Sequence, residues 1–243
     1  MKKMFRKAVL IIMAALSVNF SACVKELNNS NAQEIVDLLN QKYGIEFEVK
    51  SIGNRLASNK MDTVTAYCYP TENEKILFKA VMNIQRELVE DNYPVRVFEI
   101  TAGEFIEEKF KANGIEAVVA VSAARLSTDI ELLGTDVEDV IERYPDMSLT
   151  FTTILRDDAD SKKVYETVVG ILEELYSGTP EMSLGTMIWK YSAADYEECE
   201  KEVLSTPDIS NTVLEQHKPI SKVNLAIVKG ELNKNYDTFR SMF

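Results

Sequence analysis

Apolar residues recur every three to four positions in several stretches of the chain, which is the spacing of an amphipathic helix. Start and stop signals flank these stretches. Ser30 and Gln33 form a capping box before the first stretch and Gly44 follows it, while Thr135 and Glu138 form a second capping box. The helices predicted in this way span residues 30–43, 94–113, 135–144, 161–177 and 193–204, with one or two further turns within 236–243.

Other stretches have the pattern of β-strands. Residues 45–50 alternate between apolar and charged side chains, which indicates a half-buried strand, and residues 115–123 are almost continuously apolar, which indicates a buried one. The predicted strands span residues 45–50, 63–69, 75–82, 115–123, 148–156, 182–191 and 221–232. The order of the elements predicts an α+β fold, with mostly antiparallel sheets and helices packed on one face.

The pattern also suggests two similar halves, residues 33–123 and 135–243, with a seam around residues 127–134. Both halves begin with a capping box, an amphipathic helix and a strand. The sequence Val-Phe-Glu at 97–99, followed by Gly103, also resembles Val-Tyr-Glu at 164–166, followed by Gly170. Two unrelated amphipathic helices can produce such a likeness by chance, so duplication and coincidence both stay open.

The first 22 residues have the pattern of a signal peptide. Lys2, Lys3, Arg6 and Lys7 form a basic start, and residues 8–18 form an apolar run. A membrane-spanning helix needs about 20 apolar residues, so this run is too short to span a bilayer. We therefore expect residues 1–22 to be removed from an exported protein.

The residues that follow the apolar run are Phe20-Ser21-Ala22-Cys23. This sequence resembles the lipobox of bacterial lipoproteins, although the family usually has Leu where Phe20 stands. The resemblance implies that the Cys23 thiol receives a diacylglycerol, becomes the new N-terminus and holds the protein on the outer side of a membrane through acyl groups such as palmitate. Residues 23–32 would form the tether, which spans roughly 15–18 Å as a flexible coil. An ordinary secretory signal followed by a chance cysteine is the alternative.

The net charge of the chain limits the classes of partner that it can bind. The chain carries 27 basic and 39 acidic residues, a net charge of −12. Without the four basic residues of the leader, 23 basic residues remain and the net charge becomes −16. So acidic a body is a poor partner for nucleic acid, whose binding depends on Lys and Arg contacts to phosphate. Anionic lipid headgroups would repel it as well, so the acyl groups on Cys23 are the expected link to the bilayer.

No catalytic constellation, cofactor motif or metal site is evident in the sequence. The single histidine, His217, stands in a polar stretch, and we expect it to be exposed to solvent. A triad needs a nucleophile and an orienting carboxylate around the imidazole, and no motif supplies them. One histidine together with Cys68 and Cys199 does not make a usual zinc ligand set. No glycine-rich phosphate loop is present either.

Asp157, Asp158 and Asp160 are the best candidates for holding a cation. A calcium loop of the EF-hand type requires Gly where Lys163 stands and Glu where Val169 stands, so that motif is not satisfied. The simpler interpretation is that these acidic residues stabilise the positive N-terminus of the following helix.

The mature chain retains two cysteines besides Cys23. Cys68 and Cys199 both fall on apolar positions of their elements, which predicts buried side chains. An extracytoplasmic location would permit a disulfide between them, worth about 4–5 kcal/mol by chain entropy. We favour free thiols, because a core of this size is stable without the bond.

One set of aromatic residues is a candidate binding patch. Met187, Trp189 and Tyr191 alternate along one predicted strand, and Tyr67 and Tyr69 alternate along another. If these side chains are exposed together, they would suit a peptide, glycan or protein partner. The alternative is that they face the core, as aromatic residues of strands commonly do.

The sequence therefore predicts a lipid-anchored protein of the cell envelope, acting outside the cytoplasm as a non-enzymatic binding module. The alternative is a surface hydrolase that uses carboxylates such as Asp157, Asp158 or Glu99, since general acid-base pairs need no local motif. A solute-binding protein of a transporter is a weaker third choice, because two lobes around a ligand usually need a longer chain.

Overall fold

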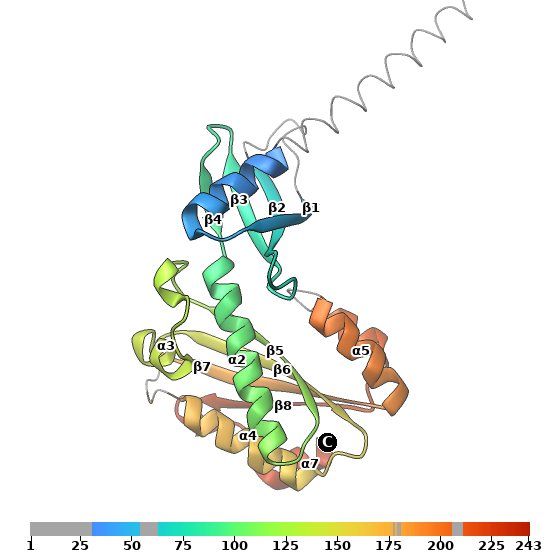
Figure 1. Ribbon diagram of the computed structural model, residues 1–243. Helices are drawn as coiled ribbons and strands as arrows, with labels where there is room; N and C mark the ends of the chain where they lie inside the picture. The colour runs from blue at the N-terminus through green and yellow to red at the C-terminus, as the bar shows by residue number, and fades with distance from the viewer. Residues whose placement is uncertain (1–30, 54–62, 177, 179–180, 206–210) are drawn as a thin grey trace, which may run out of the picture. The chain divides into compact units, whose positions relative to one another are not determined.

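The computed structural model describes residues 31–53, 63–176, 178, 181–205 and 211–243. These residues divide into two compact units. Unit 1 comprises the described residues up to Glu74 together with Phe78–Asp91, and unit 2 comprises Lys75–Leu77 and Asn92–Phe243. Figure 1 shows the elements of both units.

Unit 1 consists of one helix, residues 31–43, and one antiparallel sheet. Gly44 ends the helix with a φ of +72°, as its position predicts, whereas Ser30 of the expected capping box lies outside the described residues. The strands lie in chain order across the sheet: β1 (Phe47–Ile52), β2 (Thr63–Pro70), β3 (Phe78–Asn83) and β4 (Leu88–Asp91).

The helix of unit 1 brings apolar side chains to the core, where alternate residues of the strands are also buried. Ile35 and Leu39 of the helix are fully buried, as are Ala66 and Cys68 of β2. Asp91 at the end of β4 adds a polar link, because its carboxylate accepts hydrogen bonds from Lys42 and Tyr43 at the end of the helix, at 2.7 and 2.6 Å.

Unit 2 has a five-stranded sheet in the order β5-β6-β7-β8-β9. Its strands are β5 (Ala117–Ala124), β6 (Ser148–Arg156), β7 (Ser183–Tyr191), β8 (Ser221–Val228) and β9 (Glu231–Leu232). Its helices are α2 (Tyr93–Ala112), η1 (Ile130–Leu132), α3 (Val137–Arg143), α4 (Ser161–Leu175), α5 (Ala193–Ser205), α6 (Asn211–Gln216) and α7 (Tyr236–Met242). β6 and β7 are parallel and are connected through α4, and the other neighbouring strands are antiparallel.

The sheet of unit 2 is covered on both faces. Phe151 and Leu155 of β6 belong to the larger core, to which α2, α3, α4 and α7 also contribute. Ile154 of β6 and Trp189 of β7 point to the opposite face, where they pack with Tyr196 of α5. The predicted α+β class with mostly antiparallel sheets is confirmed. The expected single helical face does not hold for this sheet, because α5, labelled in Figure 1, and α6 pack on its second face.

The division between the units differs from the seam expected around residues 127–134. β5 and β6 lie on either side of that stretch, and they pair along their whole length within one sheet. The observed division falls between Asp91 and Asn92, at the start of α2. The sequence around this point contains no long polar linker, which is why composition did not mark it.

Several elements differ from the sequence predictions. The capping box at Thr135 is not formed: Asp136 is the N-cap residue of α3, and the Thr135 hydroxyl donates to the carbonyl of Glu131 instead. β4 and α6 lie in stretches for which the sequence predicts neither a helix nor a strand. The strand expected over 221–232 is a hairpin, because Lys229 and Gly230 both have positive φ and turn the chain between β8 and β9.

Candidate functional site

The site is built on β5, which is an edge strand of the unit 2 sheet. An edge strand presents unpaired backbone N–H and C=O groups, and proteins usually cover or block them. Here α2 lies beside the strand and covers it. Pro94 in the first turn of α2 and Gly114 just after its end, with a φ of +62°, set the limits of the helix as the sequence predicts.

Two glutamates of α2 accept hydrogen bonds from the backbone of β5. Oε1 of Glu107 lies 2.8 Å from the nitrogen of Val119, and Oε1 of Glu99 lies 2.9 Å from the nitrogen of Ala123. Eight residues of helix rise about 12 Å, and four residues of strand rise about 13 Å. The two lengths match, so one face of the helix satisfies two N–H groups on the edge of the strand.

Gly103 stands midway between these two glutamates on the helix. A Cβ atom at this position would lie 3.3 Å from the carbonyl oxygen of Val119 and 3.8 Å from a methyl group of Val121. The missing side chain therefore lets α2 approach the backbone of β5 closely. Such an approach to a strand is a common reason for a glycine inside a helix.

A pocket lies along this helix–strand contact and has an empty volume of about 550 Å³, part of it open to solvent. Its apolar lining comes from three elements: Ile100 of α2, Val119 and Val121 of β5, and Val203 of α5. Its charged lining consists of Lys75, Arg96, Glu99, Glu104 and Glu107. The enclosed space amounts to about 80 Å³, which is below the range of small-molecule sites, while the mixture of apolar walls with a few polar groups is typical of them.

Arg96 and Glu99 form an ion pair at the wall of this pocket. Nη1 of Arg96 lies 3.1 Å from Oε2 of Glu99, and each side chain is 10% exposed. Glu99 uses its other oxygen for the backbone of β5, so both of its oxygens have partners. Nε of Arg96 is buried and has no hydrogen-bond partner among the described residues. A buried N–H donor without an acceptor is energetically costly.

Glu107 has a raised pKa. Burial of the carboxyl group is the largest cause, and the negative charges of Glu104 and Glu200 raise the pKa further. The hydrogen bond from Val119 and the charge of Lys75 act in the opposite direction. A positively charged group placed here would relieve the repulsion among the three carboxylates.

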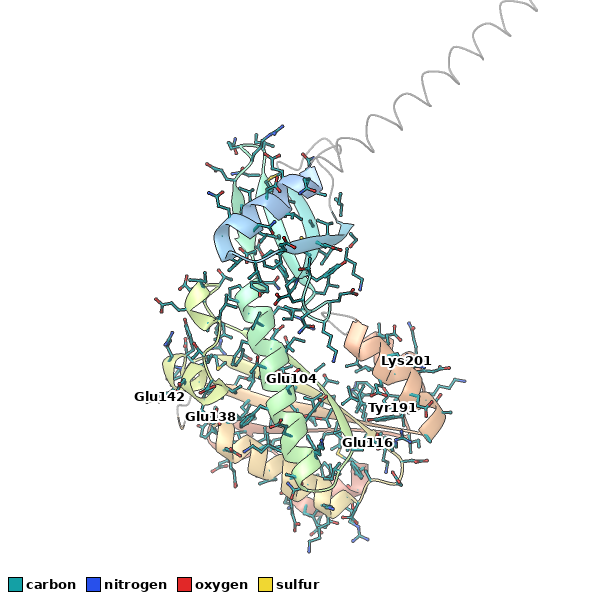
Figure 2. All side chains as sticks on the ribbon, viewed as in Figure 1. Glu104, Glu116, Glu138, Glu142, Tyr191 and Lys201 are labelled. Atoms are coloured by element: carbon teal, nitrogen blue, oxygen red, sulfur yellow. The ribbon has the colours of Figure 1, made fainter. Side chains whose placement is uncertain are left out.

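A second, shallower groove adjoins the pocket and shares Glu104 and Glu107 with it. This groove has an empty volume of about 1100 Å³ and continues past Lys111 to Glu116. Figure 2 labels Glu104 on α2, Glu116 just before β5 and Lys201 on α5. The two cavities together form an acidic surface along α2, in which Lys75, Arg96 and Lys111 are the basic side chains.

The residues of the predicted aromatic patch do not form one surface. Trp189 and Tyr191 are fully buried under α5 and α6, and Met187 packs against the same cluster. Tyr67 and Tyr69 lie on β2 in unit 1, where both are partly exposed. The expectation of a shared exposed patch is therefore wrong for Trp189 and Tyr191, because α5 covers their face of the sheet.

The buried aromatic residues have structural contacts instead. The Tyr191 hydroxyl donates to the carbonyl of Leu214 at 2.9 Å, and this hydrogen bond links β7 to α6. Burial raises the pKa of the Tyr191 hydroxyl far above its ordinary value. The ammonium of Lys222 lies 4.1 Å from the centre of the Trp189 ring, which is a cation–π distance.

His217 is not the exposed loop residue that the sequence predicts. It lies just after α6, is only partly exposed, and its Nε2 lies 2.6 Å from Oε2 of Glu202 on α5. The pair joins residues 15 positions apart, so local polarity gave no sign of it. A histidine with one carboxylate still lacks a nucleophile, and the pair holds α6 against α5.

The carboxylates proposed for a cation or for hydrolysis do not converge. Asp160 is the N-cap of α4, and its carboxylate accepts from the backbone nitrogen of Lys163 at 2.8 Å, which confirms the helix-start interpretation. Asp157 and Asp158 are exposed in the turn before that helix. Both carboxylate oxygens of Glu99 already have partners, one in Arg96 and one in the backbone of β5. Over the described part of the chain, no group of three or more His, Cys, Asp or Glu residues is placed to hold a metal ion.

The cysteines fall in three different places. Cys68 lies in unit 1 and Cys199 in unit 2, and both are buried free thiols. Cys23, the residue expected to carry the lipid, lies outside the described residues, together with the leader and most of the tether. Among the helices that the structure describes, none combines the length and the apolar run that would let it cross a membrane.

Comparison with known proteins supplies a fold but no family membership. No family model and no curated protein matches the sequence. The crystal structure of a DUF5037 family protein from Ruminococcus gnavus is similar, with a TM-score of 0.61 and 16% sequence identity. The match covers 86% of this chain and 97% of that protein. At this identity the likeness establishes a shared fold alone.

The sequence reasoning missed the residues that make the pocket: Arg96, Gly103, Glu104 and Glu107. A signal was present, because Glu99, Gly103 and Glu107 are spaced four residues apart on one face of a predicted helix. Polar residues on a helix face next to a strand can cover its edge, but the spacing alone does not say which strand they meet. The pocket follows from the pairing of α2 with β5.

Proposed function

We propose that this protein is a membrane-anchored, extracytoplasmic lipoprotein whose folded body acts as a non-enzymatic binding module. The anchor rests on the leader sequence: a basic start, an apolar run of eleven residues, and Ser21-Ala22 directly before Cys23. Two or three acyl chains on one cysteine would hold a soluble body at a membrane almost permanently, whereas a single chain binds only marginally.

The observation that carries the binding role is the pocket between α2, β5 and α5. It combines apolar walls with a buried, unpartnered N–H of Arg96 and two carboxylates, Glu104 and Glu107. Apolar walls with a small number of converging polar groups in a concave site are typical of ligand binding. The hydrolase alternative named Asp157, Asp158 and Glu99. Asp157 and Asp158 are exposed in a turn, and both oxygens of Glu99 already have partners in Arg96 and the backbone of Ala123.

The anchor is tested by replacing the thiol. The full-length chain and its Cys23→Ser variant are expressed in a bacterium and separated into membrane and soluble fractions, with radiolabelled palmitate in the medium. We expect the original chain to sediment with membranes and to carry label, and the variant to lose both. Cys199→Ser is the matched control, because that thiol is buried in the fold and its loss should change neither result. Membrane retention of the unlabelled Cys23→Ser chain would contradict the proposal.

A further inference from the structure

β1 is an edge strand of the unit 1 sheet, and its outer side borders a groove. The groove runs between β1 and the helix of unit 1, and it offers about 490 Å³ of space, against about 80 Å³ for the pocket beside α2. β5, at one edge of the other sheet, is covered by the glutamates of α2, and β9, at its opposite edge, has two residues. β1 differs from both of these edges, because a further strand has room beside it.

The backbone groups of β1 point alternately toward β2 and toward the groove. The nitrogen of Thr71 donates to the carbonyl of Glu46 at 3.0 Å, so the backbone groups of Glu46 face β2. Phe47, the next residue, faces the other way, and its nitrogen donates to the side-chain oxygen of Asn40 on the helix at 3.1 Å. Asn40 thus closes the first position of the free edge.

Val49 is the next residue whose backbone groups face the groove, because it lies two positions after Phe47. In the described part of the chain, no hydrogen bond engages its N–H or C=O on this side. The strand is regular up to this residue, and a bulge follows between Val49 and Ser51. An extended peptide laid along β1 would therefore exchange hydrogen bonds with Val49, which is the pairing used in β-strand addition.

The two faces of such an added strand would meet different surroundings. On the helix side, Ala32, Val36 and Val49 line the groove and offer apolar contacts. On the other face, Glu48 is exposed and accepts a hydrogen bond at 2.7 Å from the hydroxyl of Tyr69, its neighbour on β2. Side chains alternate between the two faces of a strand, so a fitting segment alternates apolar and polar residues.

The charge of the groove favours basic residues at the polar positions of that segment. The charged residues of its lining are Glu46 and Glu48, and both are exposed. The hydrogen bond to Glu48 raises the pKa of the Tyr69 hydroxyl, and the negative charges of Glu48 and Glu74 raise it further. Lys50, the basic residue of β1, comes after the regular part of the strand, at the bulge. A Lys or Arg on the added strand would therefore meet negative charge.

We propose that β1 accepts an extended segment of a partner protein as an additional strand, in the groove beside the helix of unit 1, and that this segment alternates apolar and basic side chains. Its apolar residues face Val36 and Val49, its basic residues face Glu46 and Glu48, and its backbone pairs with Val49. This surface lies in unit 1, so the proposal goes beyond the pocket in unit 2 and is tested separately from that pocket and from the lipid anchor.

The test is calorimetric titration of the full-length chain in detergent with the capped peptide Lys-Val-Lys-Val-Lys. One comparison peptide has Glu in place of each Lys, and another carries N-methyl groups on both valines, which removes the donors that would pair with Val49. We expect about millimolar binding of the first peptide and binding weaker by about tenfold or more for both comparison peptides, because each lacks one of the two interactions. Added salt should weaken the binding, since the ion pairs are exposed.

Hydrogen exchange measured by mass spectrometry locates the bound peptide. We expect slower exchange in the fragment that contains β1 and unchanged exchange in α2 and β5. Glu48→Gln should weaken binding by about threefold to tenfold, and it should keep the fold because the amide oxygen still accepts from Tyr69. Glu142→Gln, at an exposed glutamate of α3, is the matched control and should bind like the original chain.

Four results would overturn the proposal. The first three are a lack of binding, equal binding of either comparison peptide, and slower exchange outside β1. The fourth is equal weakening in Glu48→Gln and Glu142→Gln, because the attraction would then come from the net charge of the whole chain. Exchange at β1 that slows with protein concentration in the absence of peptide would mean that a second copy of this chain occupies the edge, which also contradicts the proposal.

Discussion

Oε1 of Glu107 lies 2.8 Å from the backbone nitrogen of Val119 and accepts its hydrogen bond across the edge of the unit 2 sheet. The carboxylate occupies the place that another strand would take, and it has negative charge next to Glu104 and Glu200. One side chain thus closes the edge of the sheet and forms part of the wall of the pocket. Its two roles can be separated by substitution.

Glu107→Gln should keep the hydrogen bond and remove the charge, since an amide oxygen can also accept from Val119. Glu107→Leu removes the acceptor, and leaving a backbone N–H unsatisfied should lower the unfolding free energy of unit 2 by about 1–3 kcal/mol. Urea unfolding followed by Trp189 fluorescence measures this, because Trp189 is the single tryptophan of the chain and is buried in unit 2. Glu142→Gln on the exposed side of α3 is the control.

The unfolding free energies of the same variants should depend on pH, and the sign follows from the raised pKa of Glu107. The pKa of Glu107 is raised in the folded protein, so the folded state holds its proton more tightly than the unfolded state does. The stability that this group contributes is full below its unfolded pKa and is lost as the pH rises through the folded pKa. Relative to Glu107→Gln, the original chain should therefore gain stability as the pH is lowered through the range in which this carboxyl group takes up its proton. A difference between the two proteins that does not change with pH would contradict the raised pKa.

Gly103 and Gly170 offer a matched pair on two helices of unit 2. Replacing a helical glycine by alanine gains up to about 1 kcal/mol when the new methyl group meets nothing. Nothing lies within 4 Å of the position of a Cβ at Gly170, so Gly170→Ala should be stabilising by this amount. At Gly103 the methyl group would lie 3.3 Å from the carbonyl oxygen of Val119, so Gly103→Ala should forfeit the gain. Equal stabilisation in urea unfolding would show that α2 does not approach β5 closely.

The surroundings of α2 show which structural features the sequence predicts and which it does not. The helix itself was predictable, since its apolar spacing, the early Pro94 and the closing Gly114 are all local signals. The link between Glu99 and Ala123 was not, because it joins residues 24 positions apart and depends on which strand stands at the edge of the sheet. The pairing of His217 with Glu202 was missed for the same reason. The shared face of Met187, Trp189 and Tyr191 was predictable from their alternation, but α5, which covers that face, could not be positioned from its own pattern.

Trp189 gives a direct test of that covered face. Its side chain is fully buried, so iodide should not quench its fluorescence in the folded protein and should quench it after unfolding in urea. The measurement needs no variant, because no other tryptophan contributes. Strong quenching in the folded state would contradict the covering of this face by α5.

Counting thiols tests the anchor and the fold together. The chain has three cysteines. Burial, with Asp91 adding to it, raises the pKa of the Cys68 thiol to about 12, and burial also raises the pKa of the Cys199 thiol. Because the thiolate is the reactive form, both should resist a thiol reagent in the folded protein.

Unfolding without a reductant should expose both of these thiols to the reagent. A Cys23 sulfur that is held in a thioether does not react with it. The membrane-extracted protein should therefore yield two reactive thiols, and so should the Cys23→Ser variant. Three would mean an unmodified Cys23. Fewer than two would mean that Cys68 and Cys199 are joined, which is incompatible with two buried free thiols in separate units. The three counts are distinct, so one titration reports separately on the modification of Cys23 and on a disulfide between Cys68 and Cys199.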